Sequence, residues 1–220
     1  MSEEKTWQPM TANQRRVAGV LIEKSKTTPD AYPLTLNSIR NGCNQKSNRA
    51  PVMNLDEDRV EQTLYELRGL GAVVEMHSGG RTAKFRHEMY EWLGVEKAGL
   101  AVMAELLLRG AQTLGDLRAR SSRMESSLQG LSDLQPVVDA LVADGLMVEL
   151  TPRGRGQIVT HNLYRPEELE KVRAEHAGGR PAASVREPAV ESRPTEPGLA
   201  DRVAALEQRV AELESLVRRS

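Results

Sequence analysis

Three groups of basic side chains are the first candidates for chemistry in this 220-residue chain, because Lys and Arg side chains bind phosphate. The groups are Arg81, Lys84 and Arg86, then Arg118, Arg120 and Arg123, then Arg153 and Arg155. Such phosphate contacts position a protein on duplex DNA without reading its base sequence. A solvated surface explains the same groups equally well, since 28% of the residues are charged. The formal net charge is −1, so any contact with nucleic acid would depend on these local groups.

Residue types that bind metals or act as nucleophiles show no comparable arrangement in the sequence. The four histidines are His77, His87, His161 and His176. None of them has metal-ligand spacing with Cys43 or with a pair of carboxylates. Lys46 could lower the thiol pKa of Cys43, although an inert buried thiol is the simpler expectation. The sequence therefore predicts a protein that is not an enzyme and has no metal site and no cofactor.

A run of polar side chains follows the single cysteine and offers many hydrogen-bond donors. Its candidate recognition residues are Asn44, Gln45, Lys46, Asn48 and Arg49. Exposed polar loops on a rigid scaffold often carry function, which favours a recognition surface. The alternative is that the amide side chains bind the free backbone groups of a long turn. Both interpretations stay open from the sequence, and we favour recognition.

The elements that must position these groups form an internal repeat. Seven positions recur 74 residues later in the chain, namely Val60, Leu64, Leu67, Gly71, Val74, Glu75 and Met76. The run that begins at Thr35 recurs 78 residues later at Thr113. Each copy reads as three helices, a strand, a basic loop and a second strand, which is the order of a winged helix-turn-helix. The sequence therefore predicts a mainly α fold with small β-hairpin wings (α+β), built from tandem winged-helix domains at 11–88 and 97–164.

The first copy is expected to contain three helices and two strands. We expect helices at about 11–26, 34–44 and 56 to 69 or 71, with strands at 72–76 and 81–86 around a turn at 78–80. Two prolines between positions 27 and 33 break the first helix. Asn54 and Glu57 have capping-box spacing at the start of the third helix.

The second copy repeats this order more tightly. We expect helices at about 97–109, 113–120 and 133–143, strands at 148–150 and 158–160 around the loop 151–156, and a short further helix at 166–176. Ser132 and Gln135 again have capping-box spacing at the start of the third helix.

The C-terminal segment departs from the repeat. Residues 177–198 contain four prolines and three glycines with few apolar groups, which predicts a flexible linker. Apolar residues then alternate spacings of four and three, which predicts a coiled-coil helix at 199–218. Its seam consists of Leu199, Val203, Leu206, Val210, Leu213 and Val217. Val at a and Leu at d favour a parallel pair and hence a homodimer, whereas the alternative is an amphipathic helix that folds back on its own domain.

The third helix of each copy is acidic, which argues against the usual role of that helix. In a winged helix the third helix enters the major groove of DNA. The first copy opens this helix with Asp56, Glu57 and Asp58. The second copy has no Lys or Arg between Ser132 and Leu146. Phosphate repels carboxylates, and they cannot make the common Arg-to-guanine contact, so sequence readout through either helix is not expected.

Several segments of both copies resemble the YceH-like family of uncharacterised bacterial proteins. They are 19–24, 32–38, 43–53, 84–87 and 105–113. The most specific of them begins Cys43-Asn44-Gln45-Lys46 and continues to Arg49, because this run is not a general feature of winged helices. The resemblance covers about 13–164 and implies a tandem winged-helix fold, but it implies no activity.

The overall composition predicts a soluble cytoplasmic protein. No apolar run approaches the ~20 residues that cross a bilayer, and the N-terminus lacks the apolar stretch of a signal peptide. Two functions follow as hypotheses. The first is a dimeric, DNA-associated regulatory protein whose wings contact phosphates with little sequence readout. The second is a protein–protein adaptor that uses the acidic third helices. The expected partners are a second copy of the chain and either double-stranded DNA or a protein, but not a membrane.

Overall fold

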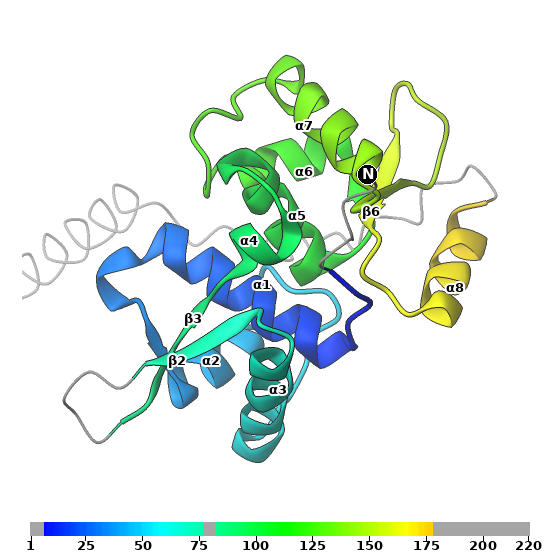
Figure 1. The fold of residues 1–220 in the computed structure, drawn as a ribbon. Coiled ribbons are helices and arrows are strands. Elements are labelled where there is room, and N and C mark those ends of the chain that lie inside the picture. Colours follow the sequence, from blue (N-terminus) through cyan, green and yellow to red (C-terminus); the bar gives the residue numbers. More distant parts are fainter. Residues whose placement is uncertain (1–6, 77–81, 178–220) are drawn as a thin grey trace, which may run out of the picture. The chain divides into compact units, whose positions relative to one another are not determined.

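The computed structural model describes residues 7–76 and 82–177, and it confirms a mixed α+β protein (Figure 1). The first repeat consists of α1 (Ala12–Thr27), η1 (Pro29–Ala31), β1 (Leu34–Thr35), α2 (Leu36–Cys43), α3 (Glu57–Gly69), β2 (Val73–Met76) and β3 (Lys84–His87). After α4 (Met89–Leu93), the second repeat consists of α5 (Lys97–Arg109), β4 (Gln112–Thr113), α6 (Leu114–Ser121), α7 (Leu131–Ala143), β5 (Met147–Glu149) and β6 (Ile158–His161). The helix α8 (Pro166–His176) follows.

Each repeat folds around a small antiparallel sheet with the same strand order. The orders are β1-β3-β2 and β4-β6-β5, so the last strand of each repeat lies in the centre of its sheet. Leu34 is opposite Phe85 in the first sheet, and Gln112 is opposite Val159 in the second. The repeat seen in the sequence is therefore a repeat of topology as well.

The first strand of each sheet was missed by sequence reasoning. Leu34 and Thr113 were assigned to the second helices, but both lie in two-residue strands. The threonine that ends each strand then caps the helix that follows: Thr35 Oγ1 accepts from the Ser38 N–H, and Thr113 Oγ1 accepts from the Asp116 N–H. A two-residue strand is too short to show the alternation by which strands are found.

Both expected capping boxes at the third helices are wrong. Asp56, not Asn54, caps α3, because its Oδ1 accepts from the Arg59 N–H at 2.8 Å. Ser132 lies inside α7, which begins one residue earlier. Asp133 accepts from the Gly130 N–H at 2.7 Å, so a carboxylate near the N-terminus of α7 binds a free backbone donor.

The helix α4 was not expected from the sequence either. It has five residues, buries Met89, Trp92 and Leu93, and ends at Gly94, whose φ of +68° suits glycine. A helix of little more than one turn shows no periodicity, but its three buried apolar residues contribute to the core beside α5.

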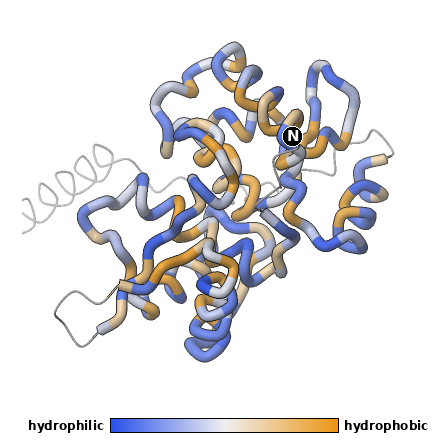
Figure 2. Tube along the Cα trace, in the orientation of Figure 1, coloured by the Kyte–Doolittle hydropathy of each residue, from blue (hydrophilic) through white to orange (hydrophobic). Residues whose placement is uncertain are grey.

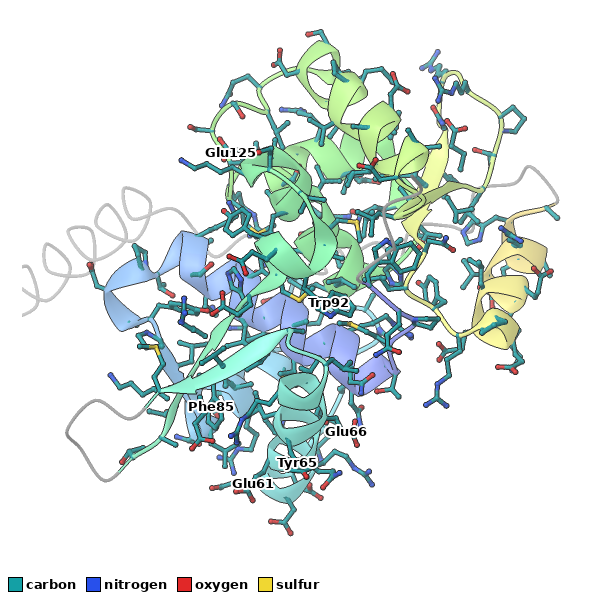
Figure 3. All side chains as sticks on the ribbon, viewed as in Figure 1. Glu61, Tyr65, Glu66, Phe85, Trp92 and Glu125 are labelled. Atoms are coloured by element: carbon teal, nitrogen blue, oxygen red, sulfur yellow. The ribbon has the colours of Figure 1, made fainter. Side chains whose placement is uncertain are left out.

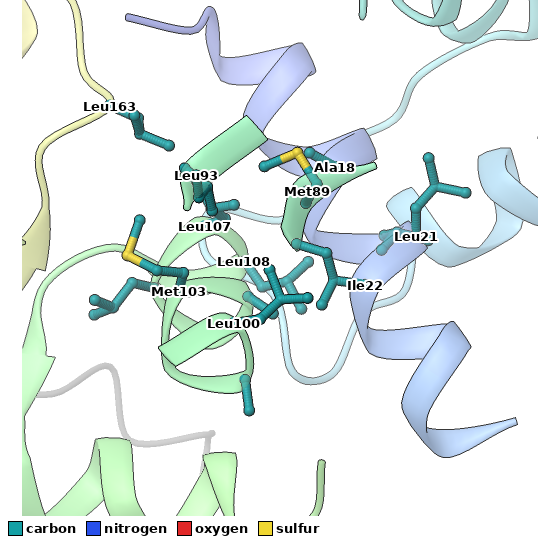
Figure 4. Close-up of a cluster of buried hydrophobic side chains, with 14 of the residues drawn as sticks. Ala18, Leu21, Ile22, Met89, Leu93, Leu100, Met103, Leu107, Leu108 and Leu163 are labelled. Atoms are coloured by element: carbon teal, nitrogen blue, oxygen red, sulfur yellow. The ribbon is translucent and has the colours of Figure 1, made fainter. Parts of the chain in front are cut away.

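The two repeats share one core, centred on the packing of α1 against α5 (Figure 4). Residues 14–23 of α1 and 99–108 of α5 are buried all round. A Cβ atom at Gly19 would lie 2.9 Å from Leu108 Cδ2, so glycine permits the close approach of the two helices. Along the chain trace, hydrophilic residues predominate in α3 (Figure 2).

Several predicted features lie outside the described residues. These are the first turn at 78–80 with Arg81, the linker from residue 178 onward, and the coiled-coil seam Leu199, Val203, Leu206, Val210, Leu213 and Val217. Within the described part of the chain, no helix has the length and apolar character needed to cross a membrane.

Candidate interaction surfaces

The polar run after Cys43 is largely built into the structure. The Asn44 side chain closes the loop between residues 44 and 55. Its Nδ2 donates to the Leu55 carbonyl and its Oδ1 accepts from the Leu55 N–H, both at 2.8 Å. Asn48 adopts a φ of +56°, and its Oδ1 accepts from Arg109 at 2.8 Å. Arg49 is buried and is paired with Glu23 at 2.5 Å.

For these three residues the geometry favours the structural alternative that the sequence left open. Of the predicted recognition loop, only Gln45 and Lys46 remain partly or fully exposed and have no hydrogen bond or ion pair with another described residue. A ligand of this loop could therefore use at most its tip.

Four of the predicted phosphate-binding side chains are held by groups of the chain itself. Arg86 pairs with Glu88 at 2.6 Å, and Arg118 donates to the Gln129 carbonyl at 3.2 Å. Arg120 donates to Gln112 Oε1 at 2.8 Å. Arg153 pairs with Glu149 at 2.7 Å and with Asp139 at 3.0 Å. These contacts compete with phosphate binding.

Three other predicted side chains are less engaged. Lys84 is half-buried and Arg155 is exposed, and neither makes an ion pair or hydrogen bond with another described residue. Arg123 is exposed and donates from Nε to the Arg120 carbonyl at 3.3 Å. The last predicted cation, Arg81, lies outside the described residues.

The solvent side of α3 carries an acidic stripe that ends in an aromatic ring. Asp58, Glu61 and Tyr65 follow helical spacing along one side of α3. Tyr65 is 70% exposed, and Figure 3 labels it on α3 together with Glu61. Asp58 and Glu61 are exposed and have no ion pair among the described residues. Glu66 lies off this stripe, since it accepts from Gln14 at 2.9 Å.

The matching helix of the second repeat differs. On α7, Asp139 is bound to Arg153 of the loop between β5 and β6, so this carboxylate is already paired. Leu131 at the start of α7 is 55% exposed. The two third helices therefore do not present equivalent surfaces.

A repeated histidine–tyrosine pair was missed by sequence reasoning. His87 and Tyr90 recur 74 residues later as His161 and Tyr164, and in each pair the two rings are in contact. His87 Nδ1 accepts from the Met89 N–H at 3.3 Å, and His161 Nδ1 accepts from the Leu163 N–H at 3.2 Å. The signal that could have revealed the pair is the shared 74-residue spacing.

Burial shifts the pKa values of two histidines and of the single cysteine. Burial lowers the pKa of His87 to about 4, and it lowers the pKa of His161 well below its usual value. Cys43 is buried, as expected, and burial raises the pKa of its thiol to about 12. Within residues 7–76 and 82–177, no three metal-binding side chains come together.

Comparisons with known proteins place the chain in a family. The model of the family described as "Protein of unknown function, DUF480" matches residues 10–157. A UPF0502 protein of Rhodopirellula baltica is 49% identical over 173 residues, which is 77% of this chain and 73% of that protein. A UPF0502 protein of an Acidovorax species is 40% identical over 220 residues, covering 96% of this chain and 92% of that protein. The chain therefore belongs to the DUF480, or UPF0502, family of uncharacterised bacterial proteins.

Proposed function

We propose that the chain is a non-catalytic tandem winged-helix protein that binds a basic segment of another protein through α3. The order helix, strand, two helices and two strands, around a sheet of order β1-β3-β2, supports the winged-helix assignment for each repeat. In that module the third helix is the recognition element, so its surface is the first place to look for a partner.

The observation that carries the proposal is the stripe of Asp58, Glu61 and Tyr65 on α3. Phosphate would be repelled by the two carboxylates, whereas Lys or Arg side chains would be attracted. A phenol ring that is 70% exposed offers a large contact area and a face for a cation. These observations support the adaptor hypothesis over the DNA hypothesis, and we propose the first repeat as the adaptor surface.

The test uses fluorescence anisotropy with a short arginine-rich peptide and a glutamate-rich peptide of the same length. The full chain should bind the first and not the second. The double variant Asp58→Lys/Glu61→Lys and the variant Tyr65→Ala should each weaken binding about tenfold or more, as expected for central interface residues. The control is Asp30→Lys/Glu91→Lys, which reverses two exposed charges elsewhere. Equal losses in the control, or no binding at low salt, would reject α3 as the site.

A second candidate is weak association with duplex DNA through the second wing. The observation is Arg155, which is exposed between Gly154 and Gly156 with φ of +144° and +81°, so the backbone there can approach a phosphate closely. Binding should weaken steeply with salt and vary little with sequence. Anisotropy of random duplex DNA across a salt series, beside the variant Arg81→Ala/Arg153→Ala/Arg155→Ala, tests this. Binding that does not change with salt or with the variant would exclude it.

We also propose that the chain forms a homodimer through the seam at 199–217. The support is the heptad pattern of the sequence, since this segment lies outside the described residues. Truncation after Pro197 should shift the oligomer toward the monomer in light scattering. A truncated chain that keeps the dimer mass would instead place the interface in the repeats.

A further inference from the structure

We propose that residues 44–55 form a strap by which the first repeat clamps the end of α5 in the second repeat. This role goes beyond the proposed function, because it concerns how the two repeats are held together. It also assigns a task to the run Cys43-Asn44-Gln45-Lys46, which the α3 surface does not use.

The strap is closed at its base by the first repeat. The Asn44 side chain pairs with both backbone groups of Leu55, and these two hydrogen bonds span eleven residues at 2.8 Å each. Arg16 of α1 is buried beneath it and donates to the Cys43 carbonyl at 2.9 Å and to the Pro51 carbonyl at 2.6 Å. One guanidinium therefore ties the residue before the strap and a residue in its second half to α1.

A buried ion pair fixes the middle of the strap. Arg49 donates to Glu23 Oε2 at 2.5 Å and to the Gly42 carbonyl at 3.0 Å. Its side chain has no exposed surface, and that of Glu23 is 8% exposed. Removing one partner of such a pair leaves the other charge buried and uncompensated, so the position of Arg49 is strongly determined.

The strap then reaches the second repeat at two points. The Ala50 N–H donates to the Leu108 carbonyl at 3.0 Å, and this carbonyl is one of those that the end of α5 leaves without a helical partner. Arg109 donates to Asn48 Oδ1 at 2.8 Å. Residues other than glycine are uncommon in the left-handed backbone conformation that Asn48 adopts. The backbone conformation at this contact therefore costs some free energy.

The residues of the strap differ in whether they bond to other parts of the chain. Asn48 and Ala50 contact the second repeat and Arg49 anchors the strap to the first, whereas Gln45 and Lys46 make no hydrogen bond or ion pair with another described residue. If the strap clamps the second repeat, a substitution in the strap should change hydrogen exchange in the second repeat. A loop that only closes on itself predicts a change confined to the strap.

Hydrogen exchange followed by mass spectrometry on the full chain distinguishes the two. Asn48→Gly keeps the backbone conformation and removes the bond to Arg109, so exchange should rise about fivefold in residues 106–121. The reciprocal variant Arg109→Gln should raise exchange in residues 44–55. The matched control Gln45→Ala/Lys46→Ala should leave both regions unchanged. Arg49→Gln, which breaks the buried pair, should lower Tm by about 10 °C.

The outcomes decide the matter in either direction. Faster exchange in 106–121 for Asn48→Gly, with no change in the control, supports the clamp. Exchange that rises only within 44–55, or rises equally in the control, overturns it. If Arg49→Gln fails to fold, Asn48→Gly still tests the proposal because it leaves the Glu23–Arg49 pair intact.

Discussion

The two repeats have the same order of elements, but the rest of the chain covers the second more fully than the first. All four residues of β6 are buried, whereas Arg86 in the equivalent strand β3 is exposed. The Met10 N–H donates to the Leu163 carbonyl at 2.9 Å, and the Arg15 guanidinium lies 4.5 Å from the centre of the Tyr164 ring.

This difference separates structural positions from surface positions. The apolar residues of the third helices that recur 74 positions later lie in the core of both halves, since Leu67 and Leu141 are both buried. The exposed charges of the third helices do not repeat: Asp58 and Glu61 on α3 are unpaired among the described residues, while Asp139 on α7 is held by Arg153. Binding is therefore expected in the less covered half.

The largest effects should come from the pair Leu67→Ala and Leu141→Ala. Both leucines are buried at equivalent positions, so each substitution should lower the free energy of unfolding by about 3 kcal/mol. Because the repeats share one core, either change should shift a single common transition in urea. Two separate transitions, each sensitive to only one variant, would show that the repeats are independent.

A smaller effect is expected where the repeats meet. Gly19→Ala places a Cβ 2.9 Å from Leu108 Cδ2 in a buried contact, and overpacking of this kind costs about 2 kcal/mol. Thermal unfolding of the full chain measures the loss. A variant as stable as the natural chain would mean that α1 and α5 separate easily.

The histidines should make both repeats acid-sensitive. Their folded-state pKa values lie below the unfolded value near 6.5, so the unfolded chain binds more protons as the pH falls. Above about pH 6.5 the two histidines do not lower the free energy of unfolding. Below it, each histidine lowers the free energy of unfolding by about 1.4 kcal/mol per pH unit, down to about pH 4 for His87. Urea midpoints measured between pH 7 and 5 should fall, and less so in His87→Gln. Midpoints that stay flat over this range would contradict buried neutral rings.

The smallest effect is expected at the end of α3. Gly69 is equivalent to Ala143 in α7, and a Cβ at Gly69 would meet no atom within 4 Å. Gly69→Ala should therefore raise stability by about 0.5 kcal/mol through helix propensity alone. Calorimetry can detect the rise in Tm, whereas a fall would reveal a contact that the first repeat needs at this position.

Sequence patterns predicted the longer elements well, because periodicity needs length. The helix α5 lies at the residues expected, and the third helices and their strands follow the 74-residue repeat. The two-residue strands β1 and β4 and the five-residue α4 lie below the length at which a pattern appears. The caps of α3 and α7 were misassigned because Asp56 and Asp133 offered competing oxygen acceptors close by.

The shared core and the strap were harder to see from the sequence. A helix that is apolar on every side must be buried on every side, and residues 100–104 and 106–108 of α5 carry that signal. The sequence around Arg49 carries no such pattern to indicate that Arg49 is buried, because its partner Glu23 lies 26 residues away in the sequence. Long-range ion pairs leave no local pattern, and so a structural arginine resembled a recognition residue.

The packing of α1 against α5 also bears on synthesis of the chain. During synthesis on the ribosome, α1 is made first. The side of α1 that packs against α5 stays uncovered until residue 109 has been added. The first repeat thus spends part of its synthesis with an apolar strip exposed. We expect nascent chains that stop before α5 to bind chaperones and to aggregate, whereas the full chain should not.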